Sequence, residues 1–183
     1  MTEVSLPKIE MPEMKLEEFL PSEEGNLKEW TSPDGKLKLK YPANWIESSE
    51  ALLDQFNQKG ATLTGANILF FSYQFRFEDQ ALAFFMVEEI SPKKNLDEIV
   101  KEIEESITEK GGKMEIINSE QEDKTARLEI KIEEKEAINS RVKEKIVFTE
   151  DKAYLVVFTS FEKDWSKFEE EINEIFDSVQ FTL

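Results

Sequence analysis

Apolar and polar residues alternate with a period of two along much of the chain, a pattern that indicates β-strands. A clear short case follows the turn sequence Ser32-Pro33-Asp34-Gly35, where apolar residues at 37, 39 and 41 alternate with lysines. The proline presets φ and the glycine accepts a positive φ, as a tight turn requires. Segments 27–30 and 36–41 are therefore predicted to pair as a hairpin.

Six further segments have the apolar content of strands, and the short turns between neighbours require antiparallel pairing. These predicted strands cover residues 67–77, 81–90, 113–120, 125–133, 139–149 and 152–161. The stretch from Tyr154 to Phe158 is apolar at every position, which indicates cover on both faces of the sheet. The strand 152–161 is therefore predicted to be central.

Three segments have the 3.6-residue period of amphipathic helices. Ser48 or Ser49 is expected to cap the first, which ends at Gly60. Asn95 with Glu98 forms the capping box of the second. The second helix ends at Gly111-Gly112, and Asp164 is expected to cap the third. Its predicted apolar face consists of Trp165, Phe168, Ile172, Ile175, Phe176 and Val179.

The order of these elements predicts an α+β domain: a twisted antiparallel β-sheet of about six strands flanked by helices, with the first hairpin at one side. Residues 26–183 form this domain in the prediction, and residues 1–25 form a flexible, acidic leader that contains Pro7, Pro12 and Pro21. No stretch approaches the ~20 apolar residues that a bilayer span needs, so no transmembrane segment is predicted.

The net charge of −17, from 40 acidic and 23 basic residues, repels phosphate backbones and anionic lipid headgroups. Nucleic acid is therefore excluded as a partner, and a protein partner is expected, although high negative charge also serves solubility alone. Most charged residues are Glu or Lys and Cys is absent, a composition that resembles hyperthermophile proteins and predicts a thermophilic source.

The chain has no histidine and no cysteine. This excludes an imidazole base, a Ser-His-Asp triad, a thiolate nucleophile and the usual zinc ligands. No glycine-rich phosphate loop and no EF-hand order of ligands is present. We therefore predict a protein that is not an enzyme and has no catalytic residue or cofactor. Weak Ca or Mn binding by carboxylates from distant segments stays open.

Two charged surfaces are candidates for partner binding. Lys36, Lys38 and Lys40 form a basic stripe that opposes the overall charge and suits an acidic partner, although lysines also protect edge strands from aggregation. Residues Glu169, Glu170 and Glu171 form an acidic patch on the last helix, which suits a basic partner or is simply a solvated face.

The three tryptophans, Trp30, Trp45 and Trp165, lie at element boundaries. They are expected to pack in the core rather than to line a ligand cleft.

Three blocks of sequence resemble the PsbP/Mog-like superfamily. They are the hairpin from Trp30 to Trp45 with its Tyr41-Pro42-Ala43-Asn44-Trp45 ending, the strand 153–159, and the closing helix with Ser178-Val179-Gln180-Phe181. The resemblance covers Leu27 to Phe181 and implies an α/β/α sandwich. It also implies protein binding without catalysis, since such domains act as photosystem subunits, GTPase-regulator partners, lipoproteins and chaperones. It provides no metal ligand.

The predicted function is thus a non-enzymatic protein-binding or scaffold domain, with a tether outside the membrane slightly favoured over a cytoplasmic location. One alternative is a cytoplasmic chaperone for apolar helices of a secreted partner, which needs an exposed hydrophobic groove. The other is a carboxylate-based sugar-binding protein or enzyme. That alternative predicts a deep cleft with two glutamates whose pKa values are strongly shifted.

Overall fold

The computed structural model describes residues 26–60, 62–133 and 139–182. The predicted leader lies outside these residues. The strands are β1 (Leu27–Thr31), β2 (Leu37–Pro42), β3 (Ile46–Glu47), β4 (Asn67–Arg76), β5 (Ala81–Ile90), β6 (Lys113–Glu122), β7 (Thr125–Glu133), β8 (Ser140–Phe148), β9 (Ala153–Phe161) and β10 (Gln180–Phe181). The helices are α1 (Glu50–Lys59), α2 (Leu96–Glu109), the 3-10 helix η2 (Glu162–Phe168) and α3 (Glu169–Ser178).

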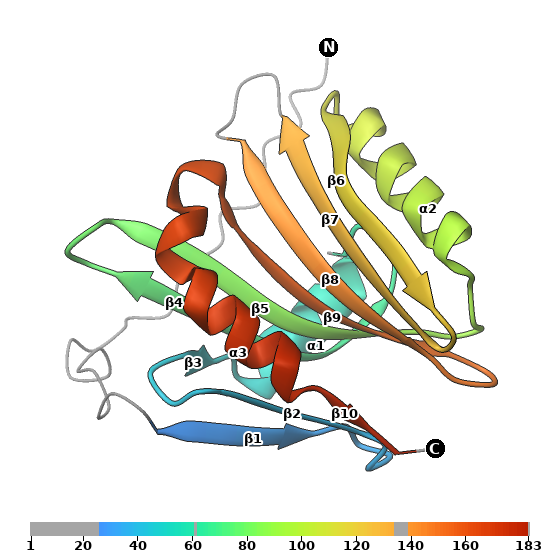
Figure 1. Ribbon diagram of the computed structural model, residues 1–183, viewed down its shortest axis with the longest axis horizontal. Helices are drawn as coiled ribbons and strands as arrows, with labels where there is room; N and C mark the ends of the chain where they lie inside the picture. The colour runs from blue at the N-terminus through green and yellow to red at the C-terminus, as the bar shows by residue number, and fades with distance from the viewer. Residues whose placement is uncertain (1–25, 61, 134–138, 183) are drawn as a thin grey trace.

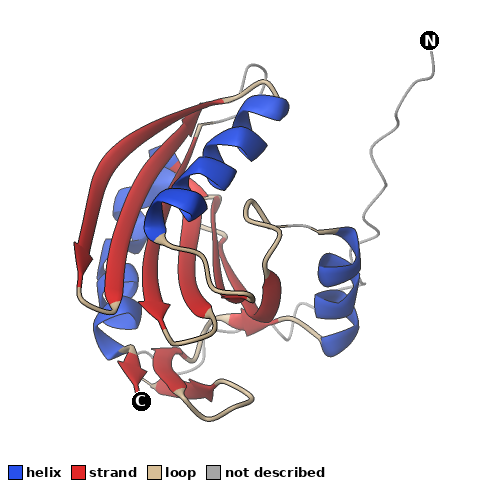
Figure 2. Cartoon of the chain, turned by 90° about the vertical axis from the view of Figure 1, so that its right-hand side faces the viewer, coloured by secondary structure: helices blue, strands red, loops and turns tan. Residues whose placement is uncertain are grey.

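The main sheet has seven strands in the order β3-β4-β5-β9-β8-β7-β6, and every neighbouring pair is antiparallel. Figure 1 shows the sheet with α3 crossing it, and Figure 2 shows α2 on the opposite face. The α+β class, the antiparallel sheet and the central position of β9 are confirmed. The seventh strand is the two-residue β3, which is too short to leave an alternating pattern in the sequence.

The first hairpin forms a separate sheet of three strands in the order β1-β2-β10. The last residues of the chain pair with β2, with Gln180 opposite Lys38. Ser178 holds this junction, because its hydroxyl accepts from the Lys40 N–H at 2.8 Å. β2 is thus the middle strand, so the interpretation of its lysines as edge-strand protection is wrong.

Two hydrophobic cores lie on either side of the main sheet. One contains the aromatic side chains between the sheet, α3 and the small sheet, including Trp45, Phe85 and Phe168. The other lies under α2 and is mainly aliphatic, with Ile99 and Ile103 at its centre. The prediction that the tryptophans pack is confirmed, since Trp45 and Trp165 are buried and Trp30 is partly buried against the first core.

Helix starts follow the predicted capping in two of three cases. Ser49 caps α1, and Asn95 with Glu98 forms the complete capping box of α2. The predicted cap at Asp164 is wrong. Residues 162–168 form the 3-10 helix η2, in which positions three apart lie on one line, so Trp165 and Phe168 are both buried. Asp164 is itself buried and accepts from Lys167 Nζ at 2.8 Å.

None of the helices in the described ranges has the length and apolar character needed to cross a bilayer.

A polar network fixes the small sheet to the main one. Tyr154 Oη on β9 donates to Asp34 Oδ2 in the first hairpin's turn, and Lys152 Nζ lies 2.9 Å from the same oxygen. Desolvation alone would raise the pKa of Asp34, but hydrogen bonds from Ser32, Tyr154, Lys152 and the Lys36 N–H hold it far below its usual value. Asp34 is therefore ionised in the folded state at all ordinary pH values.

Replacing this carboxylate tests how far the network stabilises the fold. Asp34→Asn is expected to lower the free energy of unfolding by about 1–3 kcal/mol at pH 7, because the donors around Asp34 lose a charged acceptor and one of its two oxygens is replaced by an NH2 group. The folded-state pKa is depressed, so the loss is complete above the unfolded value of about 3.9 and shrinks as pH falls below it. Urea unfolding between pH 2 and 7 measures this. The exposed Asp54→Asn is the control, and equal stability losses in both variants would contradict the prediction.

Candidate functional site

A cavity of about 180 Å³ lies between the main sheet and the segment 62–66, on the same side as α2. Figure 2 shows this segment and α2 on one side of the sheet. The lining residues are Thr62, Leu63, Thr64, Met86, Glu88, Ile132, Ser140, Val142, Glu144, Val157 and Thr159. Among these described residues, Glu88 and Glu144 are the only ionisable side chains, and the others are apolar or carry a hydroxyl group.

Glu88 on β5 is almost fully buried, with 5% of its surface exposed. Its Oε2 accepts from Thr64 Oγ1 at 3.2 Å, which joins the segment 62–66 to the sheet. Burial raises the pKa of Glu88 to about 7, and the single hydrogen bond from Thr64 opposes this only in part.

Glu144 on β8 is still less exposed, at 3%, and its Oε2 has no hydrogen-bond partner among the described residues. Burial and the neighbouring Glu88 raise the pKa of Glu144 to about 8. The two residues lie on the two neighbours of β9, opposite Leu155 and Val157, so their backbones are two strands and two residues apart, or roughly 12 Å. Two acids share one largely apolar face, and no basic residue of the described part of the chain lines the cavity beside them.

The cavity has two glutamates with shifted pKa values, as was expected of a carboxylate-based enzyme or sugar-binding protein. Its volume and the direction of the two pKa shifts differ from those of a site that hydrolyses sugars. Glycoside hydrolysis needs one ionised and one protonated carboxyl, so the environments must push the two pKa values apart. Here burial raises both. The volume also lies below the roughly 300 Å³ at which ligand pockets usually begin. The geometry favours binding of something small over hydrolysis of a sugar.

No group of three or more acidic side chains in the described part of the chain is placed to hold a metal ion. The two glutamates come from different strands, and Glu88 accepts a hydrogen bond from Thr64. A Ca or Mn site of the kind left open by the sequence is thus not built from described residues alone.

The basic stripe is exposed as predicted: Lys36, Lys38 and Lys40 all point outward from the small sheet. Glu29 on β1 lies opposite Lys40, and Thr31 lies opposite Lys38. None of the three lysines forms an ion pair with a described residue. Their role in partner binding stays a prediction.

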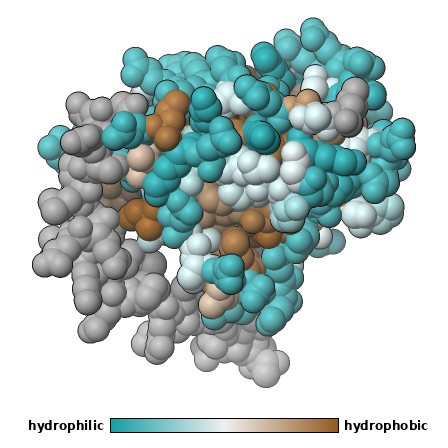
Figure 3. Space-filling model, turned by 90° about the horizontal axis from the view of Figure 1, so that it is seen from below, coloured by the Kyte–Doolittle hydropathy of each residue, from teal (hydrophilic) through white to brown (hydrophobic). Residues whose placement is uncertain are grey.

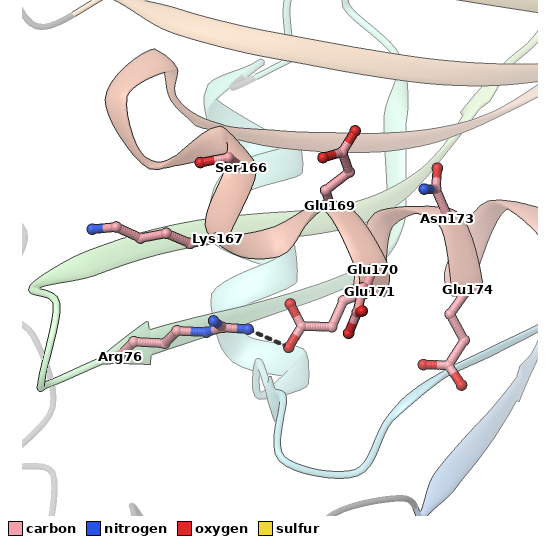
Figure 4. A pocket seen from close by; sticks show the side chains of 8 residues that line it. All are labelled: Arg76, Ser166, Lys167, Glu169, Glu170, Glu171, Asn173 and Glu174. Carbon is pink, nitrogen blue, oxygen red and sulfur yellow. Dashed lines mark hydrogen bonds and ion pairs between the residues drawn. The ribbon is translucent and has the colours of Figure 1, made fainter.

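The acidic patch is only partly as expected. Figure 4 shows Glu169 pointing away from Glu171, whose Oε1 lies 2.6 Å from Arg76 NH2. Burial raises the pKa of Glu171 despite this arginine, so the residue belongs to the packing of α3 rather than to a solvated face. Glu169 and Glu170 remain exposed, beside an open surface hollow of about 670 Å³.

The strand β6 presents a further surface that the sequence did not single out. It is an edge of the main sheet, and nine of its ten residues are exposed. A β-bulge lies between Ile116 and Asn118, so that Ile116 and Ile117 are both exposed, at 47% and 43%. On the side away from β7, β6 thus pairs with no strand of the described residues, and two adjacent isoleucines lie on this edge.

The hydrophobic groove of a helix chaperone does not emerge among the described residues. The large exposed apolar side chains are Leu27 on β1, Phe77 in the turn after β4, and Ile116 and Ile117 on β6. Figure 3 shows apolar surface broken into patches by hydrophilic side chains when the molecule is seen from below.

Sequence reasoning missed both cavity glutamates, although a local signal exists. Glu144 lies between Val142 and Ile146 in the period-two pattern of β8, which places its side chain on the apolar face. Glu88 likewise shares a face with Met86 and Ile90. A glutamate at an apolar position of a strand marks a buried carboxyl, but only the fold shows that two of them meet.

Among solved structures, cyanobacterial PsbP (CyanoP) from Synechocystis sp. PCC 6803 is similar to this chain, with a TM-score of 0.58 and 14% identity over 85% of this chain and 92% of that one. LpqN of Mycobacterium tuberculosis, involved in cell envelope biogenesis, has a TM-score of 0.50 and 9% identity over 86% and 91%. No protein-family model and no curated protein matches the sequence. The fold is therefore PsbP-like, as the resemblance implied, and at these identities the likeness carries no site residue.

The buried glutamates generate a pH-dependent stability. Each carboxyl binds its proton more tightly in the folded protein than in the unfolded chain, so the free energy of unfolding falls as pH rises from about 4.3 through the raised pKa. The slope reaches about 1.4 kcal/mol per pH unit for each carboxyl. Glu144→Gln is expected to reduce this fall and to be more stable than the natural protein at pH 8.

Urea unfolding at intervals from pH 5 to 9 measures the effect. Glu104→Gln, an exposed position on α2, is the matched control and should leave the slope unchanged. Parallel curves for the natural protein and Glu144→Gln would show that Glu144 does not hold its proton more tightly on folding.

Proposed function

We propose that this PsbP-like domain is a non-enzymatic protein-binding domain that takes up an extended basic segment of its partner along β6. The observation that carries the proposal is the open edge of β6 with its two exposed isoleucines. Extended peptides add to such edges through main-chain hydrogen bonds, while side-chain contacts on alternate positions give specificity.

Charge indicates which segment fits. Glu115, Glu120 and Glu122 lie on β6, and the chain as a whole carries a net charge of −17. Two copies of this protein would therefore repel each other at this edge, an arrangement that protects edge strands against self-association. A strand with basic and apolar side chains meets attraction instead, and electrostatic steering increases its association rate.

The side chains of this protein, rather than its fold, are the reason for proposing a non-enzymatic domain. The chain has no histidine or cysteine, and the two glutamates of the cavity are shifted in the same direction rather than apart. The basic stripe on β2 and the exposed Glu169 and Glu170 are competing surfaces for a partner. The experiment below separates the three.

A photo-crosslinking residue placed singly at positions 117, 38 and 170 maps the partner in cells of the source organism. Crosslinking at position 117 well above the other two is expected. The combined change Ile116→Glu and Ile117→Glu, made in a chain with the crosslinker at position 115, should then reduce the yield at least tenfold. Leu27→Glu, an exposed apolar position on β1, is the control.

The crosslinked segment, made as a synthetic peptide, should shift the backbone amide resonances of β6 in the purified domain. Crosslinking mainly at position 38 or 170 would move the binding surface to the basic stripe or to α3 and overturn the proposal. A peptide that perturbs neither β6 nor β7 would also overturn it.

The proposal includes a location outside the membrane, with the domain held by sequence on its N-terminal side. Its support is the acidic, proline-containing character of residues 1–25, together with the involvement of the fold neighbour LpqN in cell envelope biogenesis. External protease added to intact cells after removal of the outer layers should digest the domain. Complete protection alongside a cytoplasmic marker would contradict this location.

A further inference from the structure

The cavity at Glu88 and Glu144 is independent of the proposed surface on β6 and has no role in it. Its most unusual feature is the Glu144 carboxyl, which lines the cavity, is almost fully buried and has an oxygen without a hydrogen-bond partner among the described residues. Such a group costs the fold free energy unless something satisfies it. An apolar residue at position 144 would avoid that cost.

The lining determines the charge of a suitable ligand. Two carboxyl groups face the cavity, and its lining includes no lysine or arginine among the described residues, so a positive charge suits these residues. Hydroxyl groups of Thr64, Ser140 and Thr159 offer further acceptors around the same space. Once the two carboxyl groups are ionised, they repel an anion.

The remaining lining determines the shape. The aliphatic or thioether side chains of Leu63, Met86, Ile132, Val142 and Val157 form nearly half of the lining. A hard divalent cation needs six or more oxygen ligands and loses its water reluctantly, so this lining suits it poorly. A cation with a short apolar body can bind the carboxyl groups with its charge and contact the aliphatic side chains with its carbon atoms. For scale, a dry apolar cavity of about 150 Å³ accommodates benzene.

We propose that this cavity is a binding site for a small primary alkylammonium ion of about four to six carbon atoms. The ammonium group donates to Glu144 Oε2, to Glu88 and to a neighbouring hydroxyl, while the alkyl chain contacts Met86, Val142 and Val157. An ammonium group has three donors and no acceptor. It therefore suits the carboxyl and hydroxyl oxygens of this cavity, which can all accept hydrogen bonds.

Proton exchange gives this site a signature that a purely apolar cavity lacks. The raised pKa values keep both carboxyls largely protonated below pH 7, so an ammonium ion must displace protons when it binds. Affinity is therefore expected to rise by up to tenfold per pH unit for each proton released, between pH 6 and pH 8. Protons leave the carboxyls for solvent, and the amine stays charged throughout.

The probe is n-butylammonium chloride, titrated into the purified domain by calorimetry at pH 6, 7 and 8 in two buffers of different ionisation enthalpy. We expect a Kd on the order of 1 mM at pH 8, as suits so small a ligand, with release of protons. Glu144→Gln should weaken binding at least tenfold, and Glu104→Gln should leave it unchanged. n-Butanol, the neutral analogue, should bind without proton release or not at all.

A second measurement does not depend on the variants. Side-chain carbon resonances of Glu88 and Glu144, followed by NMR during the butylammonium titration, should move toward the ionised carboxylate position while exposed glutamates stay unchanged. Absence of binding at every pH, or equal binding to Glu144→Gln, would overturn the proposal. So would butanol binding as tightly as butylammonium, which indicates a merely apolar cavity, or CaCl2 or MnCl2 moving the same resonances at lower concentration, which indicates a metal site. Because β6 takes no part, failure of one proposal leaves the other standing.

Discussion

The strand β9 supports both hydrophobic cores, because successive side chains of an extended strand point to opposite faces of its sheet. Tyr154, Val156 and Phe158 pack into the aromatic core against α3, and Leu155 and Val157 pack into the aliphatic core under α2. Tyr154 also reaches Asp34, so the same strand anchors the turn of the small sheet. A sheet with helices on both faces needs a central strand that is apolar on both sides, and β9 meets this need because it is apolar from Tyr154 to Phe158.

The burial of the two cavity glutamates follows from the central position of β9. Glu88 and Glu144 lie on the strands on either side of β9, on a face whose other side chains are mainly apolar. Departures from local consistency of this kind concentrate at functional sites, since the fold alone gains nothing from them. The edge strand β6 lies at the end of the same sheet, where Met114 packs against the aliphatic core and the other nine residues of the strand are exposed.

Much of the fold followed from local rules of the sequence. The capping box at Asn95 and Glu98 and the turn at Ser32 to Gly35 involve residues within a few positions of one another, so their outcome depends little on distant parts of the chain. Where a distant contact competed, local reasoning was wrong. Asp164 looks like a helix cap, but burial of Trp165 and Phe168 imposes a 3-10 helix instead.

The sequence by itself determined the α+β class, the antiparallel pairing of neighbouring strands, the central place of β9 and the exclusion of imidazole and thiolate chemistry. Tertiary structure alone decided which strands became neighbours across the sheet, and hence that Glu88 and Glu144 line one cavity and that β6 is left as an edge. It also made β2 a middle strand by pairing it with the last residues of the chain. The physical reason is that hydrophobic periodicity records the environment of each residue, whereas the meeting of residues 56 positions apart depends on strand order, which no local pattern encodes.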